Sequence, residues 1–348
     1  MVSLVKPHIL ILGSSRAMQI RPALFQYQPV YNASGVVGNL SELILFSEKM
    51  AENQVHPKVV FLVVDWWWFA PSNGLHPLQE ERLVVPKDKQ KVDSEIAFEN
   101  GKPHVRFLTL SRRMLDDMVR NRQLLAEFLS HRAPCGTEKP VGLSAYVQGS
   151  GFRADGSYFY GKRADGCVNS EDYAERHDFR KEISEQKNEI RWQPRNGVCS
   201  LCRRQFVYWL DMQRTAGSEV VIFIPPVPPV VRDYLFKDRD MGYLQSTLFW
   251  LKEIASQSES LFYDAMWEHP EGESQAYLDP VHPSETTIAK SLLSFARAER
   301  KFAQVLHMPV LEKALVASDS RFSLTVEGMT QGVRSQTAAT KYAASNGR

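Results

Sequence analysis

Short apolar runs without polar alternation recur along the chain and predict buried strands. The clearest are Ile9–Leu12, Lys58–Val64 and Glu219–Pro226, and two shorter ones end at Asn32 and span Leu261–Ala265. Unalternating runs of this length, rich in β-branched residues, are typical of strands covered on both faces of a parallel sheet. The predicted fold class is therefore α/β, with a doubly wound parallel sheet.

Helical periodicity fills several of the intervals between these runs. After Asn39, which pairs with Glu42 as an N-cap, apolar residues recur at helical spacing from Leu40 to Met50. A helix-compatible segment also follows the first strand, which would complete a strand–helix–strand rhythm over the first 65 residues or so. The further helices predicted lie near 110–131, 180–191, 200–213 and 240–256, with a last one carrying Ile288, Leu292, Phe295 and Phe302.

The alternation of predicted strands and helices is interrupted in the middle of the chain and stops near its end. Residues 1–69 and 218–310 are predicted to form the α/β core, and residues 70–217, which are more polar, an insertion or lid on the sheet. Residues 318–348 are rich in Ser, Thr, Ala, Gln and Gly, so a disordered tail is expected there.

Composition excludes some classes of function. The 348 residues are 43% hydrophobic and 24% charged, and the net charge is +2, so no strong field attracts nucleic acid. No apolar stretch reaches the roughly 18 residues of a membrane span, and the N-terminus is unlike a signal peptide. The chain as written is expected to be soluble, and the residues alone assign it no compartment.

The four cysteines favour no metal site. Cys199 and Cys202 form a lone CxxC, whereas zinc would need two more ligands, and Cys135 and Cys167 stand apart. Unreactive thiols or one or two disulfides are the expected states.

Two short segments could carry chemistry. Gly13-Ser14-Ser15 follows the first strand, where α/β sheets place their ligand crevice, and Asp279-Pro280-Val281-His282 precedes the last helix. A serine hydroxyl becomes a nucleophile when a histidine takes its proton and a carboxylate orients that histidine. Each segment also has a structural interpretation, because Ser14 or Ser15 can cap a turn and His282 can cap a helix.

Four segments together resemble the SGNH hydrolase superfamily, and most closely its envelope-polysaccharide O-acyltransferase branch, which includes the alginate and cellulose acetylation proteins and the D-alanyl transfer protein. They read ILGSSR, YNASGVVGN, KVVFLVVDWWWF and DPVHP, and GFRADGSYFYG is similar to a phrase in related envelope proteins. The resemblance implies a flavodoxin-like three-layer sandwich with a large insertion. It also implies Ser15 as nucleophile, His282 as base, Asp279 as orienting acid, and the N–H groups of Ser15 and Gly35 as the oxyanion hole.

The function implied is a serine O-acyl esterase or acyltransferase that acts on an acylated glycan or small acyl ester through an acyl-enzyme. Neither a metal nor a cofactor is implied, and nucleic acid is not an expected partner. A transferase of this branch works beside a membrane protein that supplies the acyl group, in the cell envelope. The alternative is a non-catalytic SGNH-like component that binds glycan or helps assemble a polysaccharide export system.

One departure from the family pattern bears on the site. Where ordinary members have Gly-x-Asn, whose asparagine donates to the oxyanion, this chain has Asp65-Trp66-Trp67. An aspartate there would repel an oxyanion unless it is protonated or turned away, and the indole of Trp66 or Trp67 could replace the lost donor. The tryptophans can bind a sugar or fill the core, and Arg16 can hold an anionic group or pair with an acid.

Overall fold

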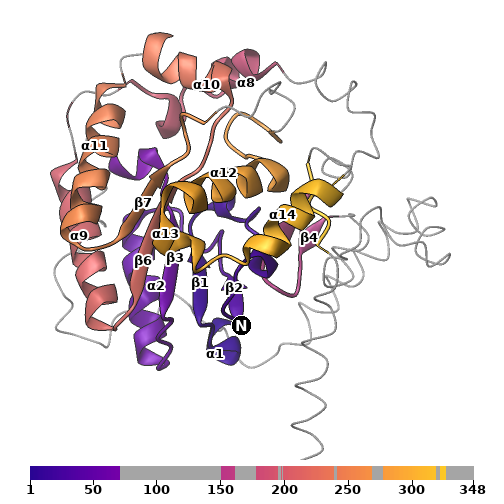
Figure 1. The fold of residues 1–348 in the computed structure, drawn as a ribbon. Helices are drawn as coiled ribbons and strands as arrows, with labels where there is room; N and C mark the ends of the chain where they lie inside the picture. Colours follow the sequence, from indigo (N-terminus) through magenta and orange to yellow (C-terminus); the bar gives the residue numbers. More distant parts are fainter. Residues whose placement is uncertain are drawn as a thin grey trace, which may run out of the picture.

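The fold is α/β, with a five-stranded sheet whose strands are all parallel (Figure 1). The computed structural model describes residues 1–70, 150–160, 178–194, 197, 199–238, 241–268, 277–318 and 322–326. The strands are β1 (Ile9–Leu12), β2 (Val30–Asn32), β3 (Val59–Val63), β6 (Glu219–Ile224) and β7 (Leu261–Asp264). All five were predicted from apolar runs, and β6 ends directly before Pro225, as expected of a residue that cannot donate to the ladder.

The strand order is β2-β1-β3-β6-β7, which reads 2-1-3-4-5 when these five strands are numbered along the chain. This is the order of flavodoxin-like doubly wound sheets, in which the ligand crevice lies at the carboxyl ends of the strands, where the order reverses. The reversal occurs here between β1 and β3, so the loops after these two strands occupy that position.

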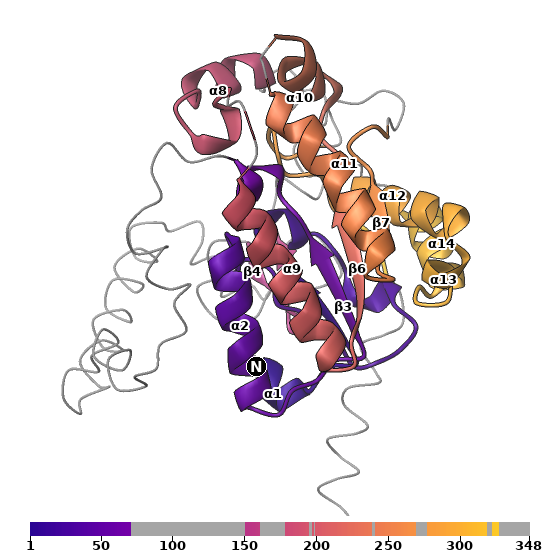
Figure 2. The ribbon, with the colours of Figure 1, turned by 90° about the vertical axis from the view of Figure 1, so that its left-hand side faces the viewer.

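Helices cover both faces of the sheet (Figure 2). Alternate strand residues point to opposite faces, so Leu10 and Ile222 belong to one core and Ile11 and Phe223 to the other. The first face is covered by α2 (Leu40–Glu52), α9 (Ser200–Thr215) and α11 (Gly242–Gln257), and the second by α12 (Glu285–Ala298), α13 (Arg300–Ala303) and α14 (Met308–Ala317). The shorter helices are α1 (Val2–Val5), α8 (Phe179–Glu185) and α10 (Pro229–Asp233).

Most of the predicted helices that fall on described residues are found, and α2 begins as expected. The Asn39 side chain accepts from the Glu42 N–H at 2.9 Å, and the Glu42 carboxylate accepts from the Gly38 N–H at 2.6 Å. The predicted helix near 110–131 lies outside the described residues. None of the described helices is long and apolar enough to span a membrane.

The segment between β1 and β2 differs from the prediction. Instead of a helix it forms two single 3₁₀ turns, Ser15–Ala17 and Pro22–Leu24. The reason is that Asn32 uses its side-chain amide to bind the carbonyls of Ala17 and Ile20, at 2.9 and 2.8 Å. The Ala17 carbonyl also accepts from the Ile20 N–H at 3.0 Å, a bond of a single turn, and Pro22 lacks the N–H that a continuing helix would need.

Part of the region predicted as an insertion belongs to the core. Helix α9 lies within 70–217, yet it packs against α2 and buries Phe206 and Trp209. Its first turn holds a disulfide between Cys199 and Cys202, one of the two states expected for these cysteines. Cys135 and Cys167 lie outside the described residues, among which no cluster suited to a metal is found.

Part of the segment predicted as a disordered tail packs against the rest of the protein. Phe322, Leu324 and Val326 are buried, and the Leu324 N–H donates to the Glu285 carboxylate at 3.0 Å. Leu324 and Val326 belong to the core beneath α12–α14, whereas Phe322 packs with Phe159 and Leu278. Residues 319–321 and 327–348 of the predicted tail lie outside the described part of the chain.

Candidate active site

The loops after β1 and before α12 bring three predicted site residues together. Ser15 Oγ lies 2.6 Å from His282 Nε2, and His282 Nδ1 lies 2.6 Å from Asp279 Oδ2. Ser15 and His282 are 267 positions apart, so the fold alone makes this contact. The imidazole can therefore take a proton from Ser15 on one side while the carboxylate holds its other nitrogen.

The loop that carries Asp279 and His282 is closed by its own hydrogen bonds. Asp279 Oδ1 accepts from the backbone N–H groups of Val281 and His282, both at 2.9 Å, and the Leu278 N–H donates to the His282 carbonyl at 2.8 Å. Burial alone would raise the pKa of Asp279, but the contact with His282 and the two N–H donors lower it to about 2. Asp279 is therefore ionised at neutral pH.

Gly13 allows the loop after β1 to pack tightly against β3. Its φ is +145°, and a Cβ added there would lie 2.8 Å from the Val63 carbonyl oxygen and 2.9 Å from Val63 Cβ. Only glycine fits this conformation and this distance. Ser14 then caps the 3₁₀ turn that begins at Ser15, because its hydroxyl accepts from the Arg16 N–H at 3.3 Å.

Of the two backbone donors expected in the oxyanion hole, one is already engaged. The Gly35 N–H donates to the Gly13 carbonyl at 2.9 Å, and the Ala33 N–H makes an equivalent bond with Ile11. These bonds extend the pairing of β1 with β2 beyond the strands, so this fold uses Gly35 for pairing rather than leaving its N–H free. The Ser15 N–H begins a 3₁₀ turn and has no backbone acceptor among the described residues.

Arg16 lies behind the site, not on its surface. Arg16 and Asp65 are both fully buried, and Arg16 Nη1 lies 3.1 Å from Asp65 Oδ1. The same guanidinium donates to the carbonyls of Val281 and Pro225, each at 3.0 Å. Arg16 thus pairs with an acid, the second of the two roles considered from sequence, and it has no exposed group with which to bind a substrate.

The pair also answers the concern that Asp65 would repel an oxyanion. Burial raises the pKa of Asp65, and Arg16 and Ser14 act in the opposite direction. Burial likewise lowers the pKa of Arg16, which Asp65 partly offsets. Pairing with Arg16 partly balances the negative charge of Asp65, which reduces its repulsion of an oxyanion.

The two tryptophans expected to bind substrate differ in position. Trp66 is buried, and its indole N–H donates to the Arg191 carbonyl at 3.3 Å, so it is not available to an oxyanion. Trp67 is partly exposed and packs edge-on against Trp66, with ring centroids 4.7 Å apart. Of the two, only Trp67 retains surface for a ligand.

Two residues near the site were missed by the sequence analysis. The Tyr160 ring lies 6.1 Å from the His282 ring, and burial together with the charge of Asp279 raises its pKa. Asp264 ends β7 at the same sheet edge, and burial, reinforced by Glu268, raises its pKa to about 6 against two opposing hydrogen bonds. Acidic residues at the carboxyl end of a strand, and aromatic residues at alternate positions after Asp-Gly, are the signals that could have found them.

The raised pKa of Asp264 predicts a pH-dependent gain in stability for Asp264→Asn. Asp264 binds its proton more tightly in the folded than in the unfolded chain, so its ionisation costs stability as the pH rises above about 4, up to about 3 kcal/mol near pH 7.5. The amide oxygen of the variant could still accept from the Met266 N–H. Melting temperatures should therefore be higher for the variant at pH 7.5 and equal near pH 4. The prediction would be contradicted if the difference in melting temperature between Asp264→Asn and the parent did not change with pH. It would also be contradicted if the exposed Asp211→Asn showed the same pH-dependent difference.

Fold and contacts together define an α/β protein with a Ser–His–Asp hydrogen-bond chain at the carboxyl edge of its parallel sheet. In comparison with known proteins, no family model, no curated protein and no solved structure matches the chain.

Proposed function

We propose that the protein is an SGNH-type serine O-acyl esterase or acyltransferase that acts on an acylated polysaccharide of the cell envelope. The observation that carries the proposal is the hydrogen-bond chain from Ser15 through His282 to Asp279, with 2.6 Å at each step. A serine, a histidine and a carboxylate in this order recur on unrelated folds for acyl transfer. The sheet order agrees with a flavodoxin-like scaffold for such a site.

The reaction follows from these contacts. Ser15 Oγ attacks the ester carbonyl while His282 Nε2 takes its proton, and Asp279 stabilises the resulting imidazolium. His282 then returns the proton to the sugar oxygen as the bond from that oxygen to the acyl carbon breaks, which leaves the acyl group on Ser15. In the second half, His282 deprotonates water or a sugar hydroxyl, and that oxygen attacks the acyl carbon. The bond from Ser15 Oγ to this carbon then breaks and His282 returns the proton to Oγ, which gives a free acid or a new ester and regenerates Ser15.

The Ser15 N–H is the donor that the site offers to the tetrahedral oxyanion. The Gly35 N–H could serve as a second donor only by leaving or sharing its bond with Gly13. Losing one oxyanion donor costs roughly 2.7–4 kcal/mol in other enzymes, so slow turnover of small esters is expected. Slow hydrolysis suits an acyltransferase, whose acyl-enzyme must last until an acceptor arrives, and a membrane acyltransferase that supplies the acyl group is the partner that this branch implies.

A second candidate function is a non-catalytic glycan-binding or assembly component. The observation that favours it is that the expected oxyanion hole is short of donors. The Gly35 N–H already donates to the Gly13 carbonyl, and in place of the family's asparagine stands Asp65, which pairs with Arg16. The two functions differ in whether Ser15 is reactive.

Labelling with a fluorophosphonate probe tests this directly. We expect the parent protein to be labelled and Ser15→Ala and His282→Ala to lose labelling, because the probe reacts only with an activated serine. Ser184→Ala, a change of an exposed serine on α8, is the matched control and should be labelled like the parent. A folded parent that is not labelled would rule out the proposed esterase and favour the binding component.

A further inference from the structure

The hairpin of β4 (Gly151–Phe152) and β5 (Tyr158–Phe159) has two different faces. Gly151 pairs with Phe159 and Phe152 with Tyr158, so the members of each pair share a face. Phe159 is buried, whereas Phe152 is 47% exposed and Tyr158 is partly exposed. The inner face therefore packs against the protein and the outer face is open.

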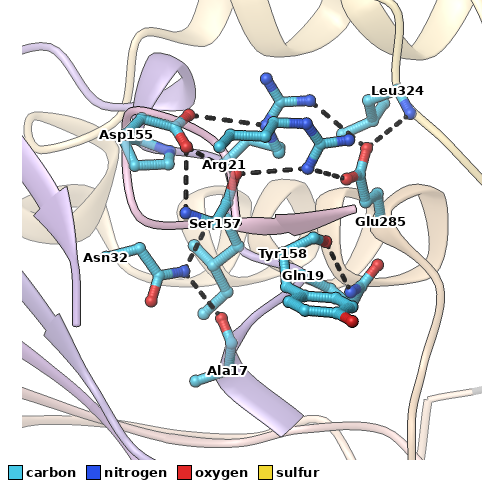
Figure 3. Close-up of polar contacts among 12 residues, drawn as sticks. Ala17, Gln19, Arg21, Asn32, Asp155, Ser157, Tyr158, Glu285 and Leu324 are labelled. Carbon is cyan, nitrogen blue, oxygen red and sulfur yellow. Dashed lines mark hydrogen bonds and ion pairs between the residues drawn. The ribbon is translucent and has the colours of Figure 1, made fainter. Parts of the chain in front are cut away.

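Buried charges hold the inner face of the hairpin in place (Figure 3). Arg153 Nη1 lies 2.8 Å from one oxygen of Glu285, and Arg21 Nη1 lies 3.5 Å from the other. Arg21 also lies 3.7 Å from Asp155 in the turn of the hairpin. Two arginines thus face two carboxylates. These ion pairs link the hairpin to Arg21, in the segment after the nucleophile, and to Glu285, at the start of α12. Arrangements of buried charge tolerate little displacement, because a separated partner would be left unpaired.

Backbone contacts fix the hairpin against the nucleophile loop as well. The Tyr158 N–H donates to the Met18 carbonyl at 3.0 Å, and the Gln19 side chain donates to the Tyr158 carbonyl at 3.2 Å. Gly156 has a φ of +85°, and a Cβ there would lie 2.0 Å from the Asn32 carbonyl oxygen. The hairpin is therefore a rigid neighbour of the segment that carries Ser15.

The outer face forms a row of aromatic rings that ends at the catalytic histidine. Ring centroids are 5.0 Å apart for Phe152 and Tyr158, 4.8 Å for Tyr158 and Tyr160, and 6.1 Å for Tyr160 and His282. Tyr160 lies two positions after Tyr158, so strand alternation places them on one side. The row begins at the exposed ring of Phe152 and ends at Tyr160, which directly follows β5. Tyr160 is partly exposed and also packs against the buried cluster of Phe159, Leu278 and Phe322.

We propose that Phe152, Tyr158 and Tyr160 form a glycan-binding wall that guides the pyranose rings of an O-acylated oligosaccharide to Ser15, an inference that rests on the proposed function. Aromatic rings give rigid apolar surfaces for the C–H faces of sugars, and the tyrosine hydroxyls offer polar partners to sugar hydroxyls. The charged groups of the hairpin, Arg153 and Asp155, are paired within the protein, and Asp279, whose charge acts on Tyr160, pairs with His282. The wall therefore recognises its ligand by stacking and hydrogen bonds, not by charge.

Calorimetric binding of O-acetylated cellopentaose to the Ser15→Ala protein, which cannot turn over the ester, tests the wall. Adding Phe152→Ala or Tyr158→Ala should raise Kd about tenfold, and Tyr158→Phe, which keeps the ring, should stay within about threefold of the starting protein. Phe249→Ala removes a ring that is 72% exposed on α11 and is the matched control, with no expected change in Kd. Melting temperatures of all variants establish that the fold is retained.

The outcomes separate the wall from the proposed function. Absence of binding by the Ser15→Ala protein, an unchanged Kd in both alanine variants, or an equal loss in Phe249→Ala would each overturn the wall. Fluorophosphonate labelling of the parent reports the reactive serine without any glycan. If the parent is labelled but the Ser15→Ala protein binds no glycan, the glycan-binding wall is excluded and the proposed esterase is retained. If glycan binding depends on Phe152 and Tyr158 but the parent is not labelled, the wall is retained and the esterase is excluded.

Discussion

Asp279→Asn should lower kcat for hydrolysis of p-nitrophenyl acetate by about 10⁴, while the fold is retained. The carboxylate accepts from His282 Nδ1 and so keeps Nε2 free to take the Ser15 proton. An amide nitrogen in the place of Oδ2 would donate to Nδ1 and favour the opposite tautomer, in which Nε2 carries the proton and cannot act as a base. Steady-state kinetics together with a thermal melt measure both parts of the expectation.

The loop should survive this change, because the amide oxygen can still accept from the N–H groups of Val281 and His282. Asp211→Asn, on the exposed side of α9, is the matched control and should have the activity of the parent. Retention of more than about a tenth of kcat by a folded Asp279→Asn protein would show that His282 does not depend on this carboxylate.

Arg16→Met should lower the free energy of unfolding by about 3–5 kcal/mol, the cost of leaving one partner of a buried ion pair unmatched. Asp65 would remain fully buried without its cation, and the carbonyls of Val281 and Pro225 would lose a donor. Urea denaturation measures the loss. Burial already raises the pKa of Asp65, and loss of Arg16 should raise it further. Part of the lost stability should therefore return as the pH is lowered toward the pKa that Asp65 has in the unfolded chain, because the buried carboxyl then becomes neutral.

The double variant Arg16→Met, Asp65→Leu distinguishes an ion pair from simple packing. Removing both charges should make this protein more stable than Arg16→Met alone, because no buried charge is left unpaired. Additive losses in the double variant would mean that the two residues contribute independently. If the free energy of unfolding of Arg16→Met is within about 1 kcal/mol of that of the parent, the ion pair does not contribute as proposed.

Local pattern was sufficient to predict the sheet and several of its helices. Unalternating apolar runs located the five strands, and Asn39 with Glu42 located the start of α2, because these signals depend on residues close in the chain. The resemblance to a known family also selected Ser15, Asp279 and His282, which the fold brings into contact. Whether Ser15 is reactive stays a prediction.

Tertiary structure decided how the polar groups around the site are used. Nothing in the sequence shows that the Gly35 N–H pairs with Gly13, or that Arg16 reaches Asp65 from a different loop. The rigid hairpin that brings Tyr160 to His282 likewise depends on Arg21 and Glu285, which lie far from it in the chain. Strand and helix propensities act over a few residues and can be read from sequence, whereas the partner of a buried donor or charge is chosen by whichever distant group the fold places within about 3 Å.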